Sequence, residues 1–277
     1  MKFTLKALTL ALATTASGVA FADESSKLPL GLEFSGSAAI TTDYRFRGMT
    51  QTKNDPAIQV GLHLAHSSGF YAGVWGSNVD FGADSETVYD EDGDVVYSLV
   101  TSSPHLELDP YIGYSYTFED INMKPWIDVG IWHYGYPSSN KDFAWTEYYV
   151  KGGVSDVIAS GDGFNATINY TNDYIGFDKD DGWYFSLGYA VPFADTGFGA
   201  NANVGYTKVK AKDSVTYFND KNHYTDWKVG VTYDFKSISG FTAELAAVGT
   251  SISKKDLDKD VKRGLDTGAV FTLTKSF

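Results

Sequence analysis

Apolar and polar residues alternate along most of this 277-residue chain. The pattern is clearest in segments 105–118, 164–174, 183–193 and 198–207, where nearly every second residue is apolar and most of the others are small or polar. Successive side chains of a strand point to opposite faces, so a period of two predicts β-strands with one apolar and one polar face.

Twelve segments of this kind predict twelve strands. We place them at residues 32–47, 57–66, 70–81, 104–118, 123–137, 142–158, 164–176, 182–193, 198–210, 222–235, 241–253 and 264–277. Short connections (66–69, 119–122, 160–163, 194–197 and 236–240) alternate with longer ones, above all 82–103, 211–221 and 254–263. Short turns at one end and long loops at the other are typical of outer-membrane barrels. The sequence therefore predicts an all-β fold, a transmembrane antiparallel up-and-down β-barrel of twelve strands.

Aromatic residues make up 16% of the chain, and many phenylalanines flank the short connections. These are Phe70, Phe118, Phe164, Phe193, Phe198, Phe235 and Phe241. Such a ring is expected of an aromatic girdle at one membrane interface. The alternative is that phenylalanine simply begins and ends strands, as in any β protein. In a barrel, the mean hydropathy of −0.21 is the average of an apolar outer wall and a polar inner wall.

The first 22 residues have the features of a signal peptide. Lys2 and Lys6 precede the apolar run 7–13, and Ala20-Phe21-Ala22 matches the small-x-small pattern of a cleavage site. A membrane anchor needs about 20 apolar residues, and this run is interrupted too early. We therefore expect cleavage after Ala22, which leaves residues 23–277 as the barrel.

Net charge and composition exclude several classes of function. The formal charge of −13 argues against a nucleic-acid partner, and the absence of cysteine excludes disulfide scaffolds and thiol chemistry. The chain has no G-x-S-x-G or H-E-x-x-H motif, and its five histidines are scattered. We expect no enzymatic activity and no cofactor. A membrane-embedded hydrolase with its serine and histidine on adjoining strands stays as an alternative.

Charged residues on the polar strand faces are the candidate lining of a lumen. They are Arg45, Arg47, Glu107, Asp109, Asp128, Glu147, Lys151, Asp173, Asp226, Lys228 and Glu244. Because acids dominate, we expect the lumen to favour cations. The alternative is that these residues form ordinary salt bridges in the wall. Arg45 and Arg47 share one strand face, where they could contact an anionic solute or lipopolysaccharide, or anchor the first strand by hydrogen bonds.

The connection 84–94 is strongly acidic. Its carboxylates are Asp84, Glu86, Asp90, Glu91, Asp92 and Asp94. Oxygen ligands at alternating positions beside a glycine could hold a divalent cation such as calcium, but the spacing does not complete an EF-hand. The alternative is a solvated acidic loop on the outer side of the barrel.

Residues 36–81 contain the most distinctive motifs of the chain. They include the sequences DYRFRG at 43–48, QT at 51–52, DPAIQ at 55–59, GFYAGVW at 69–75 and SNV at 77–79. In order and spacing these motifs resemble the TorF family of proteobacterial porin-like proteins. The resemblance implies an exported outer-membrane β-barrel that lets small solutes diffuse, with no settled substrate.

Taken together, the sequence predicts an outer-membrane channel for passive diffusion of small hydrophilic solutes, with a preference for cations. Its surroundings would be outer-membrane lipid and lipopolysaccharide. A barrel of twelve strands lies between side-chain-filled eight-stranded barrels and open porins, so we expect a narrow pore. The main alternative is a closed barrel with a structural, adhesive or sensing role.

Overall fold

The computed structural model describes residues 26–81, 84–89, 95–101, 104–137, 139, 143–176, 179–211 and 217–277. The predicted signal peptide, residues 1–22, lies outside the described residues. The side chains of the acidic segment 84–94 also lie outside the described residues, so the cation site expected there stays a prediction.

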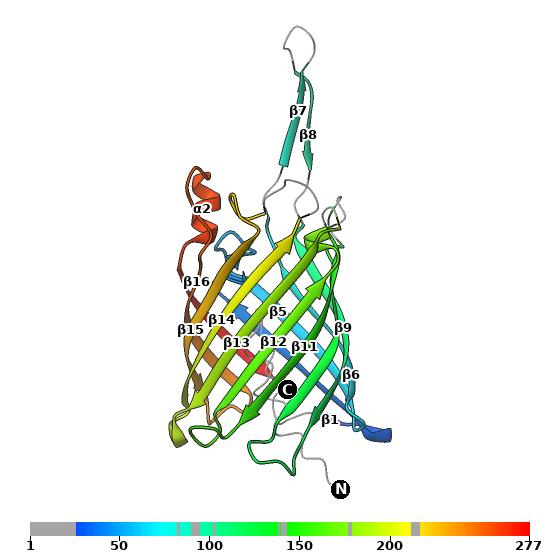
Figure 1. The fold of residues 1–277 in the computed structure, drawn as a ribbon, viewed down its shortest axis with the longest axis vertical. Coiled ribbons are helices and arrows are strands. Elements are labelled where there is room, and N and C mark those ends of the chain that lie inside the picture. Colours follow the sequence, from blue (N-terminus) through cyan, green and yellow to red (C-terminus); the bar gives the residue numbers. More distant parts are fainter. Residues whose placement is uncertain are drawn as a thin grey trace.

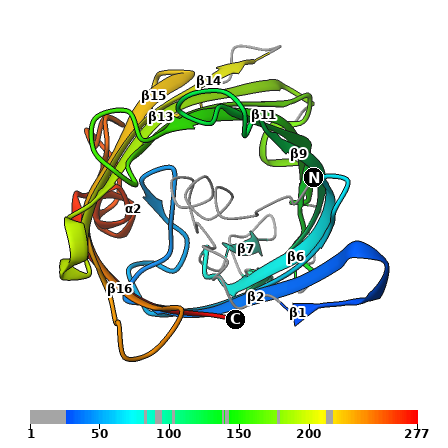
Figure 2. The same cartoon turned by 90° about the horizontal axis from the view of Figure 1, so that it is seen from below.

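Twelve long antiparallel strands close into one barrel (Figures 1 and 2). They are β2 (Leu32–Thr41), β5 (Ala57–His66), β6 (Phe70–Asn78), β9 (Leu106–Thr117), β10 (Trp126–Tyr134), β11 (Trp145–Ser155), β12 (Gly163–Thr171), β13 (Asp181–Pro192), β14 (Phe198–Lys210), β15 (His223–Asp234), β16 (Phe241–Thr250) and β17 (Gly268–Ser276). Each strand pairs with the next one along the chain, and β17 pairs with β2 to close the ring. The predicted fold class and strand number are confirmed.

Shorter elements lie at the two ends of the barrel. At the short-turn end, β1 (Ser26–Lys27) pairs with β2, and the 3-10 helices η2 (Pro29–Gly31) and η4 (Ala194–Thr196) lie in connections. At the long-loop end are the 3-10 helix η3 (Tyr174–Gly176) and the helix α2 (Lys259–Leu265). Within the described residues, no helix is long and apolar enough to cross a membrane.

Two sequence predictions differ from the structure at the long-loop end. The first strand was expected over 32–47, but β2 ends at Thr41 and the chain then forms a separate hairpin of β3 (Arg45–Phe46) and β4 (Met49–Thr50). The connection 82–103 was expected to be a plain loop, but part of it forms a hairpin of β7 (Asp84–Tyr89) and β8 (Val95–Thr101) that projects beyond the barrel (Figure 1). Its valine- and tyrosine-rich sequence favours extended pairing.

Large apolar side chains cover the outer wall of the barrel. Ile58, Val60, Leu62 and Leu64 on β5 all point outward and are exposed, while the residues between them are buried or half-buried. The remaining long strands also carry outward apolar residues. Examples are Ile40, Ile112, Val129, Val150, Ile168, Leu187, Val204, Val231, Leu245 and Phe271. A continuous apolar belt around a closed barrel requires an apolar solvent, as lipid chains provide.

Tyrosine rings on the inner wall lie over glycines of neighbouring strands. The ring of Tyr71 occupies the space where a Cβ atom of Gly113 would stand, and Tyr111 does the same over Gly73. The pairs Tyr149–Gly130 and Tyr184–Gly205 repeat this arrangement. The chain's 28 glycines therefore partly serve to make room for flat rings inside the barrel.

The inward and outward faces make a direct prediction for two neighbouring residues of β14. Val204 points outward and is 47% exposed, whereas Asn203 points inward and is 8% exposed. Val204→Arg should destabilise the barrel by about 2–4 kcal/mol because it puts a charge in the lipid, and Asn203→Arg should cost far less because it faces the polar lumen. Urea unfolding in lipid vesicles measures both. Equal costs would contradict the assignment of the two faces.

Candidate functional site within the barrel lumen

Most of the predicted lumen residues point into the barrel. Glu107, Asp109, Asp128, Glu147 and Asp226 lie on inward faces of their strands and are at most 6% exposed. Lys151 on β11, Lys228 on β15 and Glu244 on β16 are half-buried. Asp173 differs from the expectation, because β12 ends at Thr171 and Asp173 lies in the loop that follows.

The hairpin β3–β4 folds back into the lumen (Figure 2). Arg47 and Gly48 form its two-residue turn, with φ angles of 47° and 85°, which is the geometry of tight hairpin turns. A Cβ atom on Gly48 would lie 2.7 Å from the carbonyl oxygen of Gly249 and 2.6 Å from Thr250. The tip of the hairpin therefore touches the wall at β16, which is separated from β2 by β17 alone.

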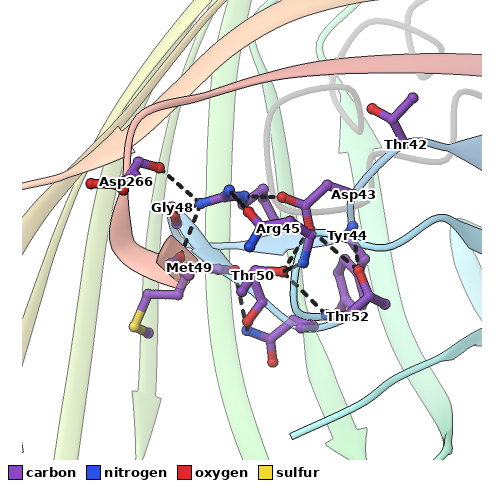
Figure 3. Close-up of polar contacts among 12 residues, drawn as sticks. Thr42, Asp43, Tyr44, Arg45, Gly48, Met49, Thr50, Thr52 and Asp266 are labelled. Atoms are coloured by element: carbon purple, nitrogen blue, oxygen red, sulfur yellow. Dashed lines mark hydrogen bonds and ion pairs between the residues drawn. The ribbon is translucent and has the colours of Figure 1, made fainter. Parts of the chain in front are cut away.

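Arg45 fastens the base of the hairpin (Figure 3). Its Nη1 donates hydrogen bonds to the carbonyl oxygens of Gly264 and Asp266, at 3.0 and 3.1 Å, next to the start of β17. Its Nη2 donates to Asn54 at 2.6 Å, and its Nε forms an ion pair with Asp43. One buried guanidinium thus joins the hairpin to the loop between β16 and β17.

Arg47 fastens the tip of the hairpin to the opposite wall. Its Nη2 donates to both carboxylate oxygens of Glu147 on β11, at 2.6 and 2.8 Å. Glu147 also accepts hydrogen bonds from Tyr134 at 3.0 Å and from Asn169 at 2.7 Å. The guanidinium lies 4.0 Å from the ring centroid of Tyr184, a cation–π contact. The hairpin is therefore held at both ends by buried charged groups, each with an ion-pair partner.

Both arginines therefore lie in the hairpin and not on the first strand of the wall, where the sequence placed them. They were expected on one face of the first strand, free for an anionic solute or lipopolysaccharide. In the structure they are at most 9% exposed and are bonded within the protein. The alternative that they act as anchors describes them better, although they anchor the hairpin rather than the strand. The period of two continues through residues 43–47, so the pattern alone could not separate hairpin from wall.

Glu244 pairs with Lys228, whereas three other inward carboxylates accept hydrogen bonds from neutral donors. Asp128 accepts a hydrogen bond from the Tyr71 hydroxyl at 2.6 Å, and Asp226 accepts one from Tyr184 at 3.2 Å. Asp109 accepts from the Trp132 indole at 3.0 Å and from the Gly135 backbone at 3.2 Å. The alternating pattern does not reveal these donors, because it treats tyrosine and tryptophan as apolar residues.

The hairpin separates two cavities in the lumen. The cavity on the short-turn side of the hairpin, called the inner cavity, has a volume of about 220 Å³. Its polar walls include Asn201, Asn203, Asp226 and Lys228. The cavity on the long-loop side of the hairpin, called the outer cavity, has a volume of about 240 Å³ and mostly aromatic walls. Arg45 and Arg47 line the inner cavity, whereas Phe46 and Met49 line the outer one. In the described part of the chain, no group of His, Cys, Asp or Glu side chains is arranged to hold a metal ion.

The closed ring, the apolar belt and the polar lumen define a β-barrel with the fold of outer-membrane porins. The chain belongs to Gcw_chp, a bacterial family of unknown function whose model matches residues 26–277. No curated protein matches its sequence.

Several solved structures with a similar fold are named as porins or channels, at low sequence identity. The NanC porin aligns with a TM-score of 0.50 at 9% identity, covering 87% of this chain and 97% of that one. The KdgM porin gives 0.49 at 9% identity, with 88% and 98% covered. An outer-membrane channel from Pseudomonas putida F1 gives 0.43 at 10% identity, with 92% and 98% covered. At such identities the likeness shows the fold alone.

The ion pair at the hairpin tip can be tested by a double-mutant cycle. Arg47→Met and Glu147→Gln should each destabilise the barrel by about 3–5 kcal/mol, because each leaves a buried charge without its partner. The double variant should cost clearly less than the two single costs added together. Urea unfolding in lipid vesicles, followed by tryptophan fluorescence, gives the three values.

The pair Lys228–Glu244 is the matched control for this cycle. Its side chains are about one quarter exposed, with Nζ and Oε1 2.9 Å apart. Its coupling should stay below about 1 kcal/mol. Equal coupling in the two pairs would show that Arg47 and Glu147 do not hold the hairpin.

Proposed function

We propose that this protein is a porin-like channel of the outer membrane, not an enzyme, through which small hydrophilic solutes diffuse with a preference for cations. In this proposal residues 1–22 direct export and are removed after Ala22. The fold, the apolar belt and the resemblance of residues 36–81 to the TorF family all support an outer-membrane location.

Buried carboxylates without a basic partner carry the proposal. Among the described residues, Glu107, Asp109, Asp128 and Asp226 point inward and form no ion pair. Among the basic groups nearby, Arg45 pairs with Asp43, Arg47 with Glu147 and Lys228 with Glu244. Lys151 lies across from Asp128 on β11 and attracts it without a direct ion pair. Acidic groups lining a low-dielectric passage raise the local concentration of cations and repel anions.

The hairpin would make this channel narrow. It leaves the wall after β2, its Arg47 reaches Glu147 on β11 across the lumen, and the cavities on its two sides have only about 220 and 240 Å³. The same observation favours the second candidate, a closed barrel with a structural or sensing role. Passage of solutes then depends on the space beside the hairpin, so conductance measurements separate the two functions.

Cation preference should be visible in planar bilayers. With a salt gradient of KCl across the membrane, the reversal potential should have the sign of a potassium-selective pore. The double variant Asp128→Asn, Asp226→Asn should lower the permeability ratio of potassium to chloride at least twofold, because two inward charges are removed.

Asp195→Asn is the control, since this exposed carboxylate lies in η4 at the short-turn end. It should leave the ratio unchanged. An anion-selective pore, or equal effects of both variants, would contradict the proposal. A folded barrel without any conductance would favour the closed alternative.

Removing the hairpin should widen the pore. The backbone N–H of Gln51 donates to the carbonyl oxygen of Tyr44 at 2.7 Å, so the two residues already face each other as an antiparallel pair. Replacing residues 45–50 by Asn-Gly would join them with a two-residue turn. Single-channel conductance should rise several-fold.

Exchange of Ser67-Ser68 for Asn-Gly, in the turn between β5 and β6, is a control outside the lumen and should leave conductance as it was. Folding of all variants is checked by the heat-dependent shift of barrel migration in gels. Unchanged conductance after removal of a hairpin in a folded barrel would show that the hairpin does not limit passage.

A further inference from the structure

We propose that the outer cavity of the lumen is a binding site for a small organic cation with an ammonium or alkylammonium head group. The proposal rests on the proposed channel function in one respect, since it names the class of solute that the same lumen would admit from its long-loop end.

The outer cavity is enclosed by aromatic rings from several parts of the chain. Phe46 comes from the hairpin, Phe81 from the loop after β6, Tyr134 and Tyr136 from the end of β10, Trp145 from β11 and Tyr174 from η3. A volume of about 240 Å³ lies below the range of about 300–1,000 Å³ typical of drug-sized ligands, so the occupant is small.

Contacts between the rings hold them in place without a ligand. Tyr134 and Trp145 stack with centroids 4.4 Å apart, and Phe46 meets Tyr134 edge to face at 5.6 Å. Tyr174 meets Trp145 edge to face at 5.6 Å. Ring faces carry a negative quadrupole, and cages of such rings bind alkylated ammonium groups. The arrangement is therefore preformed for a soft, weakly hydrated cation.

Glu107 supplies the charge that an organic cation requires. It lines the aromatic cavity and is 2% exposed. Its Oε1 accepts a hydrogen bond from the Tyr136 hydroxyl at 3.1 Å, and the Tyr44 hydroxyl also acts on the carboxylate, but its buried Oε2 has no donor in good hydrogen-bond geometry. Glu107 forms no ion pair with any described residue. A buried carboxylate is costly without a cationic partner, and a bound ammonium group would provide one.

The walls also exclude anions. Side chains along the hairpin alternate between the two cavities. Phe46 and Met49 line the outer cavity, and Arg47 lines the inner cavity. Among the described residues, the outer cavity has no lysine or arginine in its lining. Within the described lining, Glu107 carries the one charge that an entering solute meets, whereas the Arg47 guanidinium lies behind the Phe46 ring, 4.7 Å from its centroid, and is paired with Glu147.

Binding of choline tests this proposal against its neutral isostere, 3,3-dimethyl-1-butanol. Isothermal titration at pH 8 uses the whole barrel in a maltoside detergent, which has no ammonium group of its own. Choline should bind at least tenfold more tightly than the isostere. Glu107→Gln should remove most of this difference.

Asp195→Asn is the control, since this exposed carboxylate lies in η4 at the short-turn end and does not line the outer cavity. It should change choline affinity less than twofold. Equal binding of choline and its isostere, or an unchanged affinity in Glu107→Gln, would overturn the proposal.

A second pair of variants tests the rings at low risk to folding. Phe81 and Phe118 are both 41% exposed, but Phe81 lines the cavity and Phe118 lies at the opposite rim. Phe81→Leu should weaken choline binding several-fold and Phe118→Leu should not; equal effects would overturn the proposal. Binding in detergent does not need conduction. Loss of binding in a conducting barrel therefore refutes the site, and a silent barrel that binds choline refutes the channel.

Discussion

The ion pair between Arg47 and Glu147 is the interaction on which the interior of this barrel depends. Phe46 and Met49 of the hairpin pack against a buried cluster that includes Tyr134, and the ion pair adds a directed polar contact that fixes where the tip lies. Arg47 is suited to this task because its planar guanidinium reaches both oxygens of one carboxylate and stacks on the Tyr184 ring as well. Both bonds come from Nη2, so what a lysine would lose is the flat guanidinium face that lies on the Tyr184 ring.

This pair also decides which lumen carboxylates are neutralised. Glu147 is compensated by Arg47 and by two neutral donors, so it contributes little field to the lumen. Asp128 and Asp226 accept hydrogen bonds from tyrosine hydroxyls and form no direct ion pair, so their carboxyl groups face the passage. The lumen therefore combines a structural acid, bound to the hairpin, with acids available to solutes. Sequence composition alone would count all of them alike.

The wall of the barrel could be predicted from the sequence because each strand carries its own alternating pattern. In β5 the order Ile58, Val60, Leu62, Leu64 defines the outer face without any knowledge of its neighbours. The hairpin could not be predicted in this way. Its Tyr44 and Phe46 continue the alternation of β2, and only the glycine at 48 hints at a turn. Where the segment folds depends on contacts with Gly264 and Glu147, more than ninety residues away in the sequence.

The aromatic residues show the same limit for a different reason. The sequence assigns their excess to a girdle, and the phenylalanines beside the short turns are indeed largely exposed on the outside. Tyrosine, however, has an apolar ring and a polar end. Inside the barrel its ring covers a glycine and its hydroxyl holds a carboxylate, as Tyr71 does with Gly113 and Asp128. One residue type thus serves opposite faces, and its position relative to glycine decides which.

The hairpin gives this architecture its particular character. Residues 43–48, which belong to the most distinctive part of the sequence, lie in the lumen rather than in the wall. They separate a polar inner cavity from an aromatic outer one, and neighbouring residues of one short turn line opposite compartments. A wall of alternating strands can be built from many sequences, because lipid asks only for apolar side chains. A segment that crosses the lumen must satisfy every buried charge it brings, and this demand explains why the distinctive residues are two arginines and their partners.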